Sequence, residues 1–227
     1  MGFDRKALKE QAKPLFQANY WPAVVAALAL AVATGKLFTN NSVTYQITPD
    51  TPEEIQQLIA RAAAMAGMIG LLLKIFVLNP LEYGGKKFFL KNMEDRTQAT
   101  MSTLGSGFES ANYMSTVSVL LYRNVIIFLY ALLLIIPGII KSYQYYFVPQ
   151  ILADNPGISP KDACDRSKLL TDGHKMDLFV LDLSFILWEI GSSLTAGLLG
   201  IFYSNPYIYQ TQALAYRALL GEERVNY

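Results

Sequence analysis

Seven side chains of types that could do chemistry lie within or beside long apolar stretches of this sequence. They are Lys74, Lys141, Tyr143, Tyr145, Tyr146, Asp182 and Glu189. Ionisable groups are costly inside a bilayer, so such residues are the first places to look for an ion-binding or proton-coupled site. What they can do depends on the helices that position them.

Glu189 would be the deepest of these residues, ~18 Å beyond Asp177 if one continuous helix joins them. One interpretation is a proton- or cation-coupled site in a transporter. The other is a carboxyl that is protonated, or paired across helices, and holds the bundle together. We favour the second interpretation, because a structural role at that depth requires only a single carboxyl group.

The other polar residues also allow a structural and a functional interpretation. Lys74 and Asp182 are expected ~9 and ~8 Å from the inner ends of their helices, and this matching depth predicts an ion pair. Lys141 and the three neighbouring tyrosines could line a polar cavity for an anionic or lipid headgroup. We favour an aromatic belt at the membrane interface with a lysine that extends to water.

The sequence offers little for catalysis or metal binding. It has one cysteine, Cys164, and one histidine, His174, ten positions apart, which is too little for a disulfide or a Cys/His zinc site and gives no defined nucleophile and base. Phosphate-binding glycine loops, nucleophile elbows and HExxH motifs are absent from the sequence. We therefore predict no catalytic residue, no metal and no cofactor.

The composition indicates a membrane protein made of helices. Hydrophobic residues make up 52% of the 227 residues and charged residues 16%, which is more apolar than a typical globular domain. A net charge of +1 gives no basic field for nucleic acid. We expect an all-α, polytopic transmembrane bundle.

Residues 1–19 read as a basic amphipathic helix that lies on the membrane surface. Four basic residues alternate with a mainly apolar face at helical spacing: Arg5, Lys6, Lys9 and Lys13 against Leu8, Ala12, Leu15, Phe16 and Asn19. The alternative is the charged lead-in of a signal peptide, since Ala-Val-Ala precedes Thr34. We favour the surface helix, because more apolar segments follow.

Six crossings are predicted within one transmembrane domain over residues 20–220, followed by a cytoplasmic tail at 221–227. They cover residues 20–38, 57–80, 117–136, 138–153, 177–202 and 206–220, the last of which could instead be a buried half-helix. Thr51-Pro52-Glu53-Glu54 and Ser159-Pro160-Lys161-Asp162 are helix starts, and Asn79-Pro80 should end the second crossing. Residues 39–50 should form an outer loop. Lys86, Lys87, Lys91 and Arg96 should lie in a cytoplasmic loop.

Small residues four apart should let helices approach closely in the second and fifth crossings. The pairs are Ala63 with Gly67, Ala66 with Gly70, Ser193 with Gly197, and Ala196 with Gly200.

Pro137-Gly138 either kinks one long helix or turns the chain back through the membrane. The return places 15 of the 19 basic residues on one side, in agreement with the positive-inside rule. Without it, the cluster from Lys161 to Lys175 would face outward. We favour the return, with both termini cytoplasmic, although the segment 139–152 is short and polar for a crossing.

Four segments of the sequence resemble a bacterial family of uncharacterised integral membrane proteins, domain of unknown function 975. They are NYWPAV, IIPGIIKSYQYYFVPQILADNPGIS, KMDLFVLDLSFI and LGIFYSNPYIYQTQALAYRAL. The resemblance implies a multi-helix bundle in a bacterial plasma membrane and carries no activity or functional residue. The chain is also distantly similar to the membrane domains of some glycerophosphodiester phosphodiesterases, which implies an accessory role.

The leading functional hypothesis is a non-enzymatic membrane scaffold, regulator or partner subunit. Its partners would be the lipid bilayer and either another membrane protein or further copies of the chain, without nucleic acid. The alternative is a small transporter or lipid-handling protein that uses the intramembrane polar residues, and a membrane enzyme is the third hypothesis.

Overall fold

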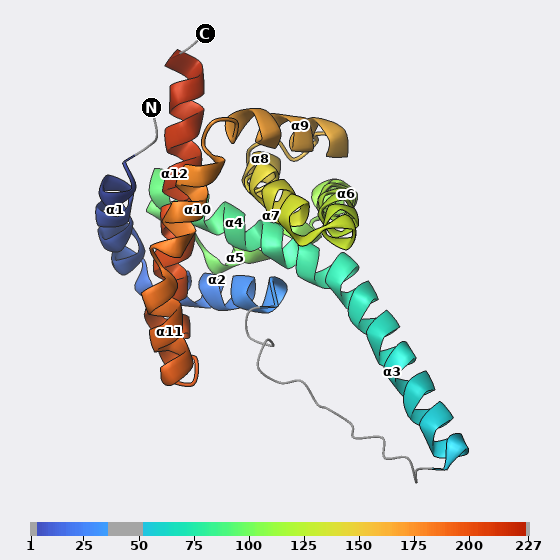
Figure 1. Ribbon diagram of the computed structural model, residues 1–227. Coiled ribbons are helices and arrows are strands. Elements are labelled where there is room, and N and C mark those ends of the chain that lie inside the picture. Colours follow the sequence, from blue (N-terminus) through green and yellow to red (C-terminus); the bar gives the residue numbers. More distant parts are fainter. Residues whose placement is uncertain (1–3, 36–51, 226–227) are drawn as a thin grey trace.

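The chain is a set of packed helices, described by a computed structural model over residues 4–35 and 52–225 (Figure 1). No β-strand occurs within those residues, so the predicted all-α class is confirmed. In the core, α4 (Asn79–Glu94) packs against α12 (Asn205–Val225), and α2 (Tyr20–Ala33) packs against both. The predicted outer loop at 39–50 lies outside the described residues.

The N-terminal segment forms two helices that meet at 110°. α1 (Arg5–Ala18) starts at Asp4, whose carboxylate accepts hydrogen bonds from the amides of Lys6 and Ala7. Its predicted apolar face is confirmed, because Leu8, Ala12 and Phe16 are buried. That face packs on α12 within the chain, so a position on the membrane surface stays a prediction. α2 ends at Ala33, and its 14 residues make ~21 Å, short of a full crossing.

The predicted helix end at Asn79-Pro80 is wrong. α3 (Glu53–Leu73) continues through a π-helical turn, Lys74–Leu78, into α4, and the whole rod has 42 residues. Proline removes a backbone donor and crowds the carbonyl four residues earlier. Here that carbonyl, on Phe76, accepts a 2.9 Å hydrogen bond from the Tyr113 hydroxyl. The wider turn and this bond allow the helix to continue, so Lys86, Lys87 and Lys91 lie on α4 rather than in a loop.

A π-helical turn before an Asn-Pro pair occurs a second time in the chain. A π-helical turn, Gly200–Ser204, is followed by Asn205-Pro206 at the start of α12. The two places share the pattern Ile-Phe-x-x-Asn-Pro-x-x-Tyr, at residues 75–83 and 201–209. The helices that follow, α4 and α12, are the two central helices of the fold.

The predicted chain reversal is observed, three residues before the expected place. A short connection after α4 contains the 3-10 turns Arg96–Gln98 and Ser106–Phe108 and α5 (Met101–Gly105), and leads to α6 (Ser110–Leu133). Leu134 is extended, and α7 (Ile135–Gln144) packs back on α6, where a Cβ on Gly138 would lie 2.7 Å from Ala131 Cα. Pro137 sits in the first turn of α7, where no amide donor is required.

The return arm is two short helices rather than one crossing over 138–153. α7 ends at Gln144, and α8 (Val148–Asp154) follows after a turn. α9 (Pro160–Leu170) then begins as predicted, since Ser159 Oγ accepts a hydrogen bond from the Asp162 amide at 3.2 Å. Passage of 138–153 through a membrane stays a prediction.

The predicted continuous crossing at 177–202 is wrong. α10 (Lys175–Leu183) ends before a break at Ser184 and Phe185, and α11 (Ile186–Leu194) ends in a turn with φ of 51° at Ala196 and 86° at Gly197. Two successive left-handed residues stop a helix. The chain then comes back, so that a Cβ on Gly200 would lie 2.3 Å from Ser192 Oγ. The small residues predicted to share one face of this crossing therefore lie on both arms of a hairpin and in its turn.

The final predicted crossing is a core helix, which agrees with the buried alternative. Most side chains of α12 from Tyr207 to Leu220 are buried. Within the described residues, Glu53–Glu94 and Ser110–Leu133 are long and apolar enough to cross a membrane, and the bent pair of α1 and α2 makes a third if it counts as one span. Six crossings are not confirmed.

Candidate functional site

A buried carboxylate with two partly buried cations beside it lies where α4 meets α6. Glu82 has a side chain only 6% exposed, and its carboxylate lies 3.0 Å from Arg123 Nη2 and 3.8 Å from Lys74 Nζ. Lys74 also donates to the Ala33 carbonyl at the end of α2, at 2.6 Å. We call Lys74, Glu82 and Arg123 the charged triad. It connects the π-helical turn, α4, α6 and α2 through groups that would be very costly to bury alone.

The charged triad corrects the predicted partner of Lys74. The expected ion pair with Asp182 is replaced by a pair with Glu82, a residue that was not predicted from the sequence. The sequence pattern does not single it out, because a helix that ended at Asn79 would place Glu82 in a loop. A continuous helix instead places Lys74 and Glu82 about two turns apart on one rod, close enough for their side chains to pair.

Asp182 belongs to a second cluster, with two of the predicted tyrosines. Its carboxylate accepts hydrogen bonds from the hydroxyls of Tyr146 at 2.7 Å and Tyr143 at 3.2 Å. The two rings stack, with centroids 5.7 Å apart and planes 9° apart. The cluster joins α7 and the turn after it to α10. Two phenol hydroxyls from one segment donating to a carboxylate on another helix make this cluster a polar link between the two.

Lys141 faces a different environment from its neighbours Tyr143 and Tyr146. Its ammonium nitrogen lies 4.6 Å from the ring centre of Tyr130 and 5.5 Å from that of Tyr145. These are cation–π distances, and they link α7 to α6. The predicted cavity residues therefore divide between the Asp182 cluster and this aromatic site.

Glu189 lies on α11 and is half-exposed. Its predicted depth assumed one helix from Asp177, and the break at Ser184 and Phe185 removes that assumption. The adjacent Trp188 packs on Tyr203, with ring centres 5.0 Å apart. The seven predicted residues are thus distributed over separate places in the fold.

Cys164 has the properties of a packed core thiol. It is 3% exposed, and burial raises its pKa to about 11. A nucleophilic cysteine needs the opposite shift and an accessible sulfur. His174 lies 3.6 Å from the Asp177 carboxylate at the start of α10. Among the described residues, no group of three or more His, Cys, Asp or Glu side chains could hold a metal ion.

A buried amide network ties the N-terminal helices to the core, and it was not predicted. Asn92 Nδ2 donates to Gln210 Oε1 at 2.7 Å, and Asn19 Nδ2 donates to Asn92 Oδ1 at 3.1 Å. Gln210 also donates to the Phe89 carbonyl at 3.3 Å. Asn92 and Gln210 each follow one copy of the repeated Asn-Pro pattern, so that repeat was a signal for the paired helices that carry them.

These features define a class: a helical protein in which, over the described residues, two or three helices are long and apolar enough to cross a membrane and polar links join the helices. Residues 123–223 match the sequence model of a family described as "Protein of unknown function (DUF975)". The match supports the resemblance to domain of unknown function 975 over that part of the chain. Comparison with curated proteins gave no match, and comparison with solved structures gave none. The distant similarity to glycerophosphodiester phosphodiesterase membrane domains stays a prediction.

Proposed function

We propose that the chain is a multi-pass protein of a bacterial plasma membrane, with both termini cytoplasmic, that acts as a non-enzymatic scaffold, regulator or partner subunit through helix packing. The apolar rods Glu53–Glu94 and Ser110–Leu133 support its integration into the bilayer. Lipid is its first partner, and another membrane protein or a second copy of the chain is the next.

The observation that carries this proposal is the charged triad. All its charged residues lie within the two apolar rods, and they pair with one another across the helices. In a low-dielectric environment, such pairing holds helices in register. The Asp182 cluster and the Lys141 site link helices in a similar way. Polar residues in these places serve packing more directly than they serve a transport path.

The free surface of α3 supports a role as a partner subunit. None of its residues is buried, and long apolar side chains cover it, including Leu58 at 67% and Met68 at 60% exposure. Cβ atoms added at Gly67 and Gly70 would meet nothing within 4 Å. A helix of this kind offers lipid an apolar surface and offers a second helix a small-residue face.

The test asks first whether the protein conducts ions. The purified chain is reconstituted into vesicles that contain a pH-sensitive dye, and a proton or sodium gradient is applied. We expect vesicles that contain the protein to show no more proton or sodium flux than vesicles without protein. A flux that the Glu189→Gln variant abolishes would overturn the proposal in favour of the transporter alternative.

The second arm asks whether α3 engages a partner. Native membranes are solubilised in mild detergent, and the size of the complex is compared for wild type and a Gly70→Leu variant. The new side chain has open space in the single chain, so folding and insertion should be unchanged, while the larger complex should be lost. Wild type that migrates as the bare chain would count against a partner subunit.

A further inference from the structure

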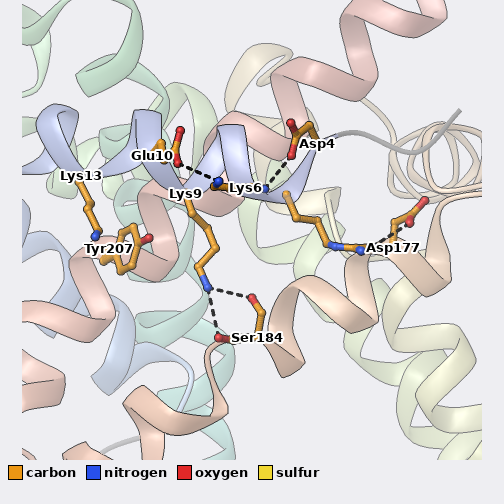
Figure 2. Close-up of a pocket in the computed structure, with 9 residues that line it drawn as sticks. Asp4, Lys6, Lys9, Glu10, Lys13, Asp177, Ser184 and Tyr207 are labelled. Carbon is orange, nitrogen blue, oxygen red and sulfur yellow. Dashed lines mark hydrogen bonds and ion pairs between the residues drawn. The ribbon is translucent and has the colours of Figure 1, made fainter.

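A cavity of about 690 Å³, wide open to solvent, lies beside α1, between that helix, α10 and α12 (Figure 2). Nine residues line it: Asp4, Arg5, Lys6, Lys9, Glu10, Lys13, Asp177, Ser184 and Tyr207. Four of these are cations and three are anions, so the lining carries a net positive charge. It is separate from the charged triad and from the Asp182 cluster. We call it the α1 cavity.

The cations of the α1 cavity differ in their partners. Arg5 lies 3.2 Å from the Asp177 carboxylate, and Lys6 lies 4.0 Å from Glu10. Lys9 instead donates to Ser184, at 3.2 Å to its carbonyl and 3.1 Å to its hydroxyl. Lys13 lies 5.7 Å from the Tyr207 ring centre. Two ammonium groups therefore rest on neutral partners.

Lys9 and Lys13 act together because they lie four positions apart on one helix. Figure 2 shows both side chains extending from α1 to the same side, toward Ser184 and Tyr207. Like charges at this spacing repel one another on a helix surface. An anion that both ammonium groups contact would remove that repulsion and gain two charge-assisted hydrogen bonds. The α1 cavity has the charge pattern of a phosphate site.

The surroundings of the α1 cavity point to an amphiphilic ligand. Ser184 lies in the wall of the cavity. Three residues near it in the chain have exposed apolar side chains: Leu183 at 47%, Ile186 at 49% and Leu187 at 76% exposure. An exposed apolar surface thus begins next to the charged lining and continues along α11. A lipid could place its headgroup phosphate between the lysines and its acyl chains along α11.

We propose that the α1 cavity binds a phosphate-bearing anion through Lys9 and Lys13, with the headgroup of an anionic phospholipid as the ligand chemistry that fits both the charges and the neighbouring apolar surface. This site goes beyond the scaffold role and does not depend on it. It gives the N-terminal helix a lipid-dependent attachment to α10 and α12.

The experiment measures the thermal unfolding temperature of the full chain in an uncharged maltoside detergent. Phosphatidylglycerol, phosphatidylcholine and inorganic phosphate are added separately. We expect phosphatidylglycerol at about 100 times its Kd to raise Tm by roughly 5 to 10 °C, with little change from phosphatidylcholine. The shift should disappear in a Lys9→Gln/Lys13→Gln variant, and each variant is compared with its own lipid-free Tm.

Matched charge removal provides the control. A Lys161→Gln/Lys168→Gln variant loses two exposed lysines from α9 and should keep the full shift. Because Lys9 also packs over the Phe185 ring at 4.1 Å, a Lys13→Gln single variant is included in case the double variant folds poorly.

The outcomes separate the two sources of phosphate. A lysine-dependent shift with phosphatidylglycerol alone supports a headgroup site, and the same shift with inorganic phosphate supports the phosphate chemistry with a free anion as its source. The proposal is overturned if neither ligand shifts Tm, if the Lys9 and Lys13 variants keep the shift, or if the α9 variant loses it equally.

Discussion

Single residues in this chain gain their roles from partners that are distant in the sequence. Glu82 is the clearest case, since its nearer partner, Arg123, comes from another helix, while Lys74 lies on the same rod. Its carboxylate is the one anion of the charged triad. Removing it would leave the largely buried Arg123 and the partly exposed Lys74 without their counter-charge, which costs more than the pair contributes when intact.

We therefore predict that Glu82→Gln lowers the free energy of unfolding by about 3 to 5 kcal/mol. Denaturant titration of the purified protein in detergent micelles, followed by circular dichroism, measures it. A Glu53→Gln variant, at an exposed position in the first turn of α3, should change the stability little. If both variants lose stability equally, the loss does not come from the ion pairs of Glu82.

A second substitution tests whether the loss comes from unpaired charge. Arg123→Met alone should also destabilise, because Glu82 then keeps only the longer contact with Lys74. Combined with Glu82→Met, it should cost clearly less than the two single losses added together, since the two charges leave as a pair. Strict additivity would contradict direct coupling of these residues.

Several residues of these clusters could be found from the sequence, but Glu82 and Arg123 of the charged triad, and most pairings, could not. Ionisable and tyrosine side chains in apolar segments are visible in any reading of the chain, and Asp182, Tyr143 and Tyr146 do meet. Which helix faces which is decided by tertiary packing, about which periodicity within one segment carries no information. Lys74 was therefore assigned a partner by depth alone, and the network of Asn92 and Gln210 was missed.

At the scale of elements, three glycines allow the close approaches around α4. A Cβ on Gly84 would lie 2.1 Å from the Leu104 carbonyl oxygen, and one on Gly85 would lie 2.4 Å from Leu30 Cγ. On the facing segment, a Cβ on Gly107 would lie 2.2 Å from the Pro80 carbonyl oxygen. In two of the three cases, the atom that the added Cβ would meet belongs to the backbone and cannot rotate away.

We predict that Gly84→Ala lowers the free energy of unfolding by about 1 to 3 kcal/mol, because the added methyl group must push the backbone at Leu104 away. Gly67→Ala on α3 is the matched control. Its Cβ meets nothing within 4 Å, and alanine favours the helix, so no loss is expected. Denaturant titration measures both. Equal stability of the two variants would mean that α4 and the segment at Leu104 are not packed as described.

Element types were predicted better than element ends. Apolar length and the helix starts at Pro52 and Ser159 identified the helices, and the positive-inside rule favoured a reversal after α6. The breaks depended on local hydrogen bonding that the sequence does not display. Asn79-Pro80 reads as a stop, yet a π-helical turn and the Tyr113 hydroxyl satisfy the Phe76 carbonyl. Conversely, the apolar run around Ala196 contains little that predicts the left-handed turn there.

In the proposed orientation of the whole molecule, the distribution of basic residues decides which side of the membrane each region faces. The exposed face of α9 carries Lys161, Arg166 and Lys168, and the proposed orientation places this helix in the cytoplasm. The start of α3, with acidic Glu53 and Glu54 in its first turn, lies on the opposite side in that orientation. These two regions therefore offer reporters for the two faces.

The native cysteine does not disturb such an experiment. With the pKa of Cys164 raised to about 11 by burial, only about one thiol in a thousand is ionised at pH 8. Its sulfur is also shielded from reagents. A thiol probe should thus leave the folded wild-type chain unlabelled on either side and react once the protein is unfolded, which provides the blank and the positive control.

Cysteines are then introduced singly at two exposed positions, Gln57 in α3 and Lys168 in α9. A membrane-impermeant maleimide is applied to intact cells and, separately, to opened cells. We expect Gln57→Cys to label in both and Lys168→Cys to label only after opening, because the proposed orientation places the basic face of α9 in the cytoplasm. Labelling of Lys168→Cys from outside would contradict the predicted return of 138–153 through the membrane, and the sides proposed for α9 and for the C-terminus would then be wrong.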